Sequence, residues 1–230
     1  MSLNVIEPNK VIQDAVYIGD YKFSCGNNVP IYHVGSVYSL TQIIGYVKYI
    51  NSSYGNVFYR GQCKLHDSIE PSIYHGITSD KARQRRNALL NEIISRAMND
   101  KGFANFLKLD GSTISRIKIE SVFQHYGIPT HYIDVVDNHW TALWFGGNRY
   151  ISYLKDSFCK YEKRTINLID VLQKRTELSQ NDYADFLASI RDDMYQYLLM
   201  IAVSKEETPF GNGINEGTDT ISVDLRNTLP

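Results

Sequence analysis

Between Gln124 and Asp134 the chain reads Gln-His-Tyr-Gly-Ile-Pro-Thr-His-Tyr-Ile-Asp. Two histidines and an acid thus surround a Gly-Ile-Pro turn, and glycine and proline are the residues that most often interrupt helices and strands. The apolar-rich residues before the turn, 112–126, predict a helix, and the β-prone residues after it, 130–136, predict a strand. We therefore expect the polar side chains of this stretch to lie between a helix and a strand.

A short helix is expected directly after that strand. Asp137 or Asn138 has the short polar side chain that caps a helix N-terminus, and the apolar residues that follow end at Gly146-Gly147. The chain around the turn also holds three histidines, His125, His131 and His139. Their spacing matches none of the usual zinc-ligand patterns, so the sequence predicts no metal site. We interpret His125 either as an acid, base or substrate contact or as a histidine hydrogen-bonded for structural reasons.

The second unusual segment is Val57-Phe58-Tyr59-Arg60-Gly61-Gln62, in which an arginine follows an apolar run. The run predicts a short strand that stops at Arg60-Gly61. The guanidinium of Arg60 could donate paired hydrogen bonds to a phosphate or carboxylate, or it could pair with a buried acid for structural reasons. Gly61 would allow either a close backbone approach or a positive φ.

The remaining sequence alternates short β-prone runs with helical patterns in no regular βαβ order. This predicts an α+β fold with a mixed or antiparallel sheet of short strands flanked by helices. We expect one helix that begins at Ser39 and another that begins at Ser79 or Asp80. Further helices are predicted over residues 165–175 and 181–203, and a strand is predicted over residues 220–225. We assign residues 1–35 to an N-terminal extension and residues 36–230 to the main domain.

The composition is that of an ordinary globular protein, and it excludes a disordered chain, a collagen-like chain and a coiled coil. The chain has 230 residues, with 24 Lys and Arg against 25 Asp and Glu. It shows no secretory signal, no membrane-spanning run and no paired cysteine spacing, which is typical of a cytoplasmic protein.

One helix begins with a cluster of cations, Lys81, Arg83, Arg85 and Arg86. We expect this cluster to be a solvated face and not a nucleic-acid platform, because no aromatic residue lies between the cations.

Both unusual segments together resemble the FRG domain family, which takes its name from a Phe-Arg-Gly motif. Here the motif reads Phe58-Tyr59-Arg60-Gly61-Gln62, and Ile69-Glu70-Pro71-Ser72-Ile73 is similar to the turn that follows it in the family. The strongest similarity lies in residues 124–134 and in the Thr141-Ala142-Leu143-Trp144-Phe145 helix after them. The resemblance covers roughly residues 36–147.

The chain departs from the family pattern at three places. His131 stands where the family usually has Arg, Val135-Val136 replaces a usual Trp-Thr, and Gly146 replaces Ala. A further family segment, a late strand with a Gln-x-Gly element, is expected after Leu225. We therefore expect the FRG-like domain to be truncated at its C-terminus.

The order of motifs is also similar to that of ADP-ribosyltransferases, and this implies a nucleotide site with NAD as the candidate cofactor. Under this hypothesis Arg60 holds a phosphate, His125 and Asp134 are the catalytic candidates, and Glu216 is the late acid nearest the last predicted strand. The remaining ligand-binding candidates are Gln62, Gln124, Thr130, His131 and Asn138. The resemblance further implies a bacterial or phage conflict setting.

The alternative hypothesis is a non-catalytic interaction module that binds a protein partner. In that case Arg60, His125 and Asp134 form a structural hydrogen-bond cluster. The two hypotheses make opposite demands on the same residues, since a ligand site needs polar groups that are available and a structural cluster needs polar groups that are paired.

Overall fold

A computed structural model describes residues 4–8, 10–24, 26–109, 111, 113–152 and 159–204. Within these residues the chain forms two compact units. The first unit contains residues up to Ser68 together with those from Val135 onward, and the second unit contains Ile69–Asp134. The fold is α+β, as the sequence predicts.

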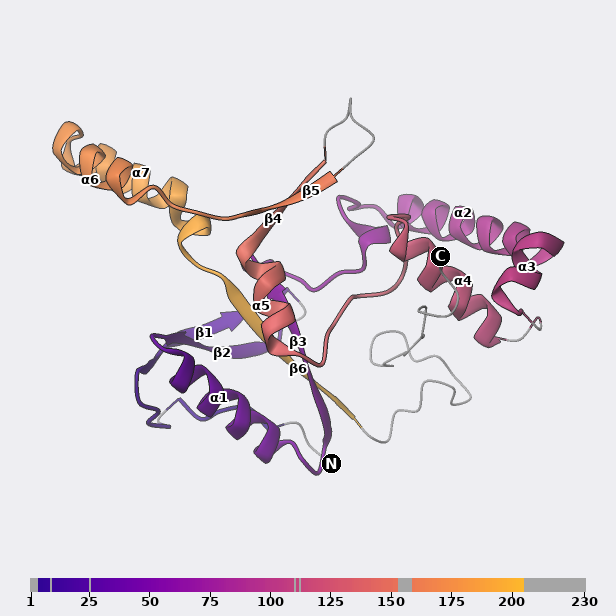
Figure 1. Cartoon of the computed structure of the whole chain (residues 1–230), viewed down its shortest axis with the longest axis horizontal. Helices are drawn as coiled ribbons and strands as arrows, with labels where there is room; N and C mark the ends of the chain where they lie inside the picture. The colour runs from indigo at the N-terminus through magenta and orange to yellow at the C-terminus, as the bar shows by residue number, and fades with distance from the viewer. Residues whose placement is uncertain are drawn as a thin grey trace. The chain divides into compact units, whose positions relative to one another are not determined.

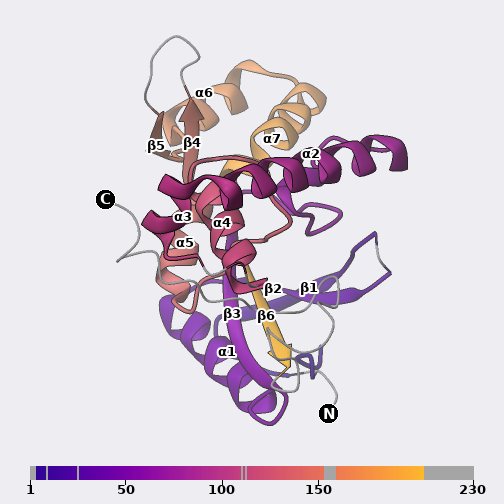
Figure 2. The ribbon, with the colours of Figure 1, turned by 90° about the vertical axis from the view of Figure 1, so that its right-hand side faces the viewer.

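Within the described residues the first unit has ten elements. In chain order they are β1 (Ala15–Lys22), β2 (Asn28–Val34), α1 (Val37–Ile50), β3 (Gly55–Gln62), α5 (His139–Gly147), β4 (Asn148–Ser152), β5 (Cys159–Lys163), α6 (Leu168–Glu177), α7 (Gln180–Met194) and β6 (Tyr197–Ser204). Its described strands pair as three antiparallel two-stranded sheets, β1 with β2, β3 with β6, and β4 with β5. Figures 1 and 2 show β3 and β6 side by side, although they are far apart in sequence.

The core of the first unit lies on one face of the β3–β6 sheet. Val57 and Tyr59 from β3 are buried there against Ile44 of α1 and Ala142 of α5. Side chains alternate between the two faces of a strand, so Phe58, Arg60 and Gln62 lie on the opposite face. A neighbouring cluster places Ile43 of α1 against residues of the β1–β2 hairpin.

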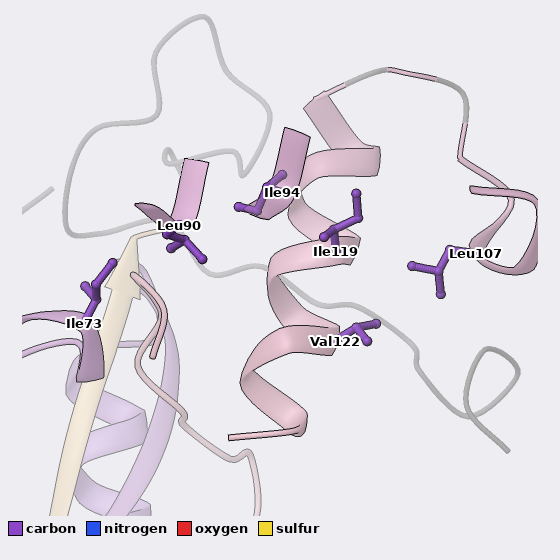
Figure 3. Packing of buried hydrophobic residues seen from close by; sticks show 6 residues of the cluster. All are labelled: Ile73, Leu90, Ile94, Leu107, Ile119 and Val122. Carbon is purple, nitrogen blue, oxygen red and sulfur yellow. The ribbon is translucent and has the colours of Figure 1, made fainter. Parts of the chain in front are cut away.

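The second unit consists of η1 (Ser72–Tyr74), α2 (Asp80–Asn99), α3 (Lys101–Leu107) and α4 (Thr113–His125). Its core brings together one or two apolar side chains from each of these elements, as Figure 3 shows: Ile73, Leu90, Ile94, Leu107, Ile119 and Val122. Ser79 caps α2 with its side chain, and this is one of the two N-caps that the sequence proposes for the helix.

The helix predicted over residues 181–203 is wrong in its second half. Helix α7 ends at Met194, and residues 197–204 form strand β6, which pairs with the whole of β3. The run from Leu198 to Val203 is continuously apolar, and such a run fits a buried helix as well as a strand. Pairing with β3 decides between the two conformations.

The strand predicted over residues 130–136 is also wrong. Only Val136 makes an isolated bridge, to Tyr59, in which each backbone N–H donates to the other residue's carbonyl. The N-cap of α1 differs as well, because Ser36 caps the helix and Ser39 is its partner in a capping box. The strand predicted over residues 220–225 lies outside the described residues.

Candidate functional site

Gly61 lets α5 approach β3 more closely than any other residue would allow. A Cβ atom built at Gly61 would lie only 1.6 Å from the carbonyl oxygen of Ala142. On the facing helix, a Cβ at Gly146 would meet the backbone nitrogen of Gln62 at 3.2 Å. Of the two roles that the sequence leaves open for Gly61, the close backbone approach is therefore the one that the structure shows.

Arg60 lies within β3, which continues to Gln62 and does not stop at Arg60-Gly61. The side chains of Arg60 and Gln62 are half-buried. In the antiparallel register Arg60 is paired with Leu199 and Gln62 with Tyr197. Paired residues share a face of the sheet, so the Arg60 stem lies beside Leu199, and Arg60 already has an interaction within the chain.

Asn138 caps the N-terminus of α5, and it is one of the two residues that the sequence proposes for this role. Its side-chain Oδ1 accepts hydrogen bonds from the backbone nitrogens of Trp140, at 2.8 Å, and Thr141, at 3.3 Å. The sequence also predicts that Asn138 binds a ligand. The described contacts show its capping role, and ligand binding by Asn138 stays a prediction.

Three predicted site residues form one hydrogen-bonded cluster in the second unit. The Thr130 hydroxyl donates to Oε1 of Gln124 at 2.5 Å, and Nε2 of Gln124 donates to Oδ1 of Asp134. The backbone nitrogen of Thr130 donates to the hydroxyl of Ser72 at 3.0 Å. Thr130 is fully buried. These bonds join the end of α4, the turn after it and η1. They pair side-chain groups that would have stayed available if residues 130–136 had formed a strand.

His131 is held by a buried carboxylate. Oε1 of Glu120, whose side chain is only 5 % exposed, lies 2.8 Å from both the backbone nitrogen and the Nδ1 atom of His131. The other ring nitrogen, Nε2, lies 3.1 Å from Oδ1 of Asn87. His131 therefore links α4 to α2, and the ligand contact that the sequence predicts for it stays a prediction.

Tyr132 lies close to the same carboxylate. Burial raises the pKa of its hydroxyl well above the usual range, the negative charge of Glu120 raises it further, and Arg116 partly offsets both effects. The neutral phenol is therefore the form that the fold favours.

His125 is exposed at the last residue of α4. Among the described contacts its ring meets that of Tyr126 edge-on, with 5.3 Å between the ring centroids. Arg60 belongs to the first unit, and His125 and Asp134 belong to the second. Glu216 lies outside the described residues.

Two of the four cations near the start of α2 have structural partners. Nη1 of Arg86 donates to the carbonyl oxygens of Ile73 and His75, at 2.9 and 3.3 Å. Arg83 lies 3.6 Å from Glu70 and over the ring of Tyr74. A groove of about 470 Å³ also lies here, and none of the predicted site residues lines it: its lining is Gly76, Ile77, Thr78, Ser79, Ala82, Arg85, Arg86 and Leu89.

Glu120 and Asn87 are not among the site residues that the sequence predicts. Neither belongs to a recognisable motif, and each is one of several polar residues in its helix. A signal for Glu120 is nevertheless present, since it directly follows Ile119 in an apolar-rich helix, and a buried carboxylate needs donors.

In the described part of the chain, no helix has the length and apolar character needed to span a bilayer. The same residues contain no group of three or more His, Cys, Asp or Glu placed to hold a metal ion. Comparison with protein families matches residues 55–152 to the FRG domain. No curated protein and no solved structure matches the chain. The family match covers both unusual segments of the sequence and confirms the predicted resemblance.

Proposed function

We propose that the FRG domain of this chain binds the phosphates of a nucleotide, NAD being the first candidate, through Arg60 in an ADP-ribosyltransferase-like cleft. The observation that supports this proposal is the face of β3 opposite to α1 and α5. Phe58, Arg60 and Gln62 follow one another there at alternate positions, and all three are half-buried. They offer an aromatic ring, a guanidinium fork and an amide, which suit a base, a phosphate and a ribose hydroxyl.

The surroundings of Arg60 strengthen this interpretation. Leu199 and Ile201 of β6 lie beside Arg60 and Phe58 on the same face. An apolar environment screens charges less than water does, so a guanidinium placed here would attract a phosphate more strongly than one on an open surface. Under the proposal His125 and Asp134 remain the catalytic candidates, and the domain acts in a bacterial or phage conflict setting.

Arg60→Lys tests the proposal, because it keeps the positive charge and removes the fork. Thermal melts of the parent chain with NAD and with ATP should show a rise in melting temperature. The Lys variant should bind more weakly by roughly 1–3 kcal/mol, the scale of a charge-assisted hydrogen bond. Arg85→Lys, in an exposed arginine of α2, is the matched control and should bind like the parent. No nucleotide effect on the parent, together with a lower melting temperature of Arg60→Lys alone, would contradict the proposal.

The second candidate is a non-catalytic module that binds a protein partner. A specific observation favours it, because Gln124, Thr130 and Asp134 are hydrogen-bonded to one another. Their groups support the turn after α4 without any ligand. This candidate predicts that Thr130→Val lowers the melting temperature equally in the presence and absence of nucleotide. The nucleotide proposal predicts an additional loss of binding in that variant.

A further inference from the structure

The hydroxyl of Tyr59 is buried without a partner. Tyr59 lies within β3, and the fold covers its whole surface. Among the residues that the structure describes, no group forms a hydrogen bond with its hydroxyl oxygen. A buried hydroxyl that stays unpaired destabilises a fold, and most buried tyrosines have a partner for it. Packing alone therefore does not explain why this position carries a tyrosine and not a phenylalanine.

The side chain of Tyr59 projects from β3 toward the N-terminal end of α5. Its ring meets the ring of His139, the first residue of that helix, edge-on, with 5.7 Å between the centroids. Two backbone hydrogen bonds between Tyr59 and Val136, of 2.7 and 2.9 Å, hold the chain in place just before the helix. The unpaired hydroxyl therefore belongs to a side chain that is fixed beside the start of α5.

A cation from a third element lies over the same ring. Nζ of Lys48, in the last turn of α1, is 5.5 Å from the centroid of the Tyr59 ring. The lysine is exposed, whereas the ring beneath it is buried. An exposed side chain changes its rotamer within picoseconds to nanoseconds. The ammonium group of Lys48 is therefore able to leave the ring and to pair with a negative charge beside it.

The groups that meet at the start of α5 are suited to an anion. The tyrosine hydroxyl and the lysine ammonium group donate hydrogen bonds, and the imidazole of His139 has a nitrogen that can do the same. The N-terminal end of α5 adds the partial positive charge of the helix dipole. Asp137, the acid nearest to His139 in sequence, is exposed, so water screens its charge.

We propose that Tyr59, Lys48 and His139 bind the phosphate group of a ligand at the start of α5. The three side chains come from three elements of the first unit, so their donors approach from different directions. A phosphate has acceptor oxygens in several directions, whereas a carboxylate has only two oxygens in one plane. Lys48 moves from the ring to the phosphate and so opens the way to the Tyr59 hydroxyl. The site lies on the face of β3 opposite to Arg60 and does not depend on the function proposed for Arg60.

The stability of the chain without ligand separates this role from a purely structural one. A hydroxyl that serves the fold is paired, and its removal lowers the melting temperature. The Tyr59 hydroxyl has no partner among the described residues, so Tyr59→Phe should leave the melting temperature unchanged or raise it by up to about 2–4 °C. Binding of phosphate should be lost in the same variant, and a structural tyrosine would not show this combination.

Thermal melts of the full chain in inorganic phosphate test the proposal. Phosphate should raise the melting temperature of the parent above its value in sodium chloride of equal ionic strength, because it binds the folded state. In Tyr59→Phe the phosphate dissociation constant should be at least about tenfold higher, the scale of one hydrogen bond to a charged group. Tyr49→Phe changes an exposed tyrosine of α1 and is the matched control, which should respond like the parent. A parent that does not respond, or an equal response of Tyr59→Phe through the general salt effect of phosphate, would overturn the proposal.

A surface variant keeps the test valid if Tyr59→Phe fails to fold. Lys48→Gln removes the cation from an exposed position and should also weaken phosphate binding, whereas Lys81→Gln, an exposed lysine of α2, should not. Sodium acetate is the comparison anion, and a response to acetate as large as that to phosphate would contradict the assignment to phosphate. A phosphate response that persists in Lys48→Gln and disappears in Arg60→Lys would place the phosphate on the other face of β3 and would overturn the proposal.

Discussion

The Arg-Gly segment on β3 and the Gln-His segment after α4 are held by different kinds of contact. At Gly61 the backbone of α5 lies directly on the strand, and the contact depends on the absence of a side chain. At Thr130 and His131 the contact consists of side-chain hydrogen bonds to Gln124 and Glu120. The first contact depends on close packing and the second on pairing of buried polar groups, so the two should respond differently to substitution and to pH.

Gly61→Ala should have the largest effect on stability. The new Cβ would overlap the carbonyl oxygen of Ala142, and neither backbone can move without disturbing the core of the first unit. We expect a loss of more than about 3 kcal/mol in the free energy of unfolding. Urea unfolding can be followed by fluorescence at α5, which contains both tryptophans of the chain.

Gly45→Ala is the matched control for Gly61→Ala. Gly45 lies inside α1, and a Cβ there would meet no atom within 4 Å. Alanine favours the helix, so this change should raise the stability by about 0.5–1 kcal/mol. If both glycine variants unfolded at the same urea concentration, the close approach of α5 would not explain Gly61.

Glu120→Ala should have the next largest effect. It leaves the backbone nitrogen and Nδ1 of His131 without their acceptor, and an unpaired buried donor costs about 1–3 kcal/mol. Glu120→Gln retains an oxygen acceptor and should lose less. Glu92→Ala is the control, since it removes an exposed ion pair with Arg96 and should change the stability by less than about 0.5 kcal/mol. Equal thermal melts of Glu120→Ala and Glu92→Ala would contradict a structural role for the buried carboxylate.

The same contrast explains which elements the sequence could predict. Helices α2 and α5 have local signals, a cap at Ser79 or Asn138 and apolar residues at helical spacing, and both were predicted. Strand β6 depends on a partner far away in the sequence, and its continuous apolar run fits either conformation. Residues 130–136 have the composition of a strand, but their polar groups bond to α4 and η1 instead.

The candidate site was predictable to a similar extent. The residues of the Gln124–Asp134 motif lie close together in sequence, so their grouping follows from the turn at Gly127, where φ is +81°. Glu120 and Asn87 each reach His131 from another helix position, and only the packing of α2 against α4 brings them there. Pairing of this kind has no signature in one sequence.

Tyr132→Phe should have the smallest effect and is visible only at alkaline pH. Burial and Glu120 raise the pKa of Tyr132 in the folded chain, whereas an unfolded tyrosine titrates near pH 10. The unfolded state therefore loses the proton first, and the stability that the neutral phenol provides is present below about pH 10 and falls as the pH rises further. One proton sets an upper limit of about 1.4 kcal/mol per pH unit on the slope of stability against pH, and the partial exposure of Tyr132 reduces it.

Urea unfolding of the parent and of Tyr132→Phe from pH 8.5 to pH 11 measures this slope. The variant has no proton to lose at this position, so its stability should fall less steeply than that of the parent. Equal slopes would show that Tyr132 is solvated, and that the polar contacts around Glu120 are no more sensitive to pH than the backbone contact at Gly61.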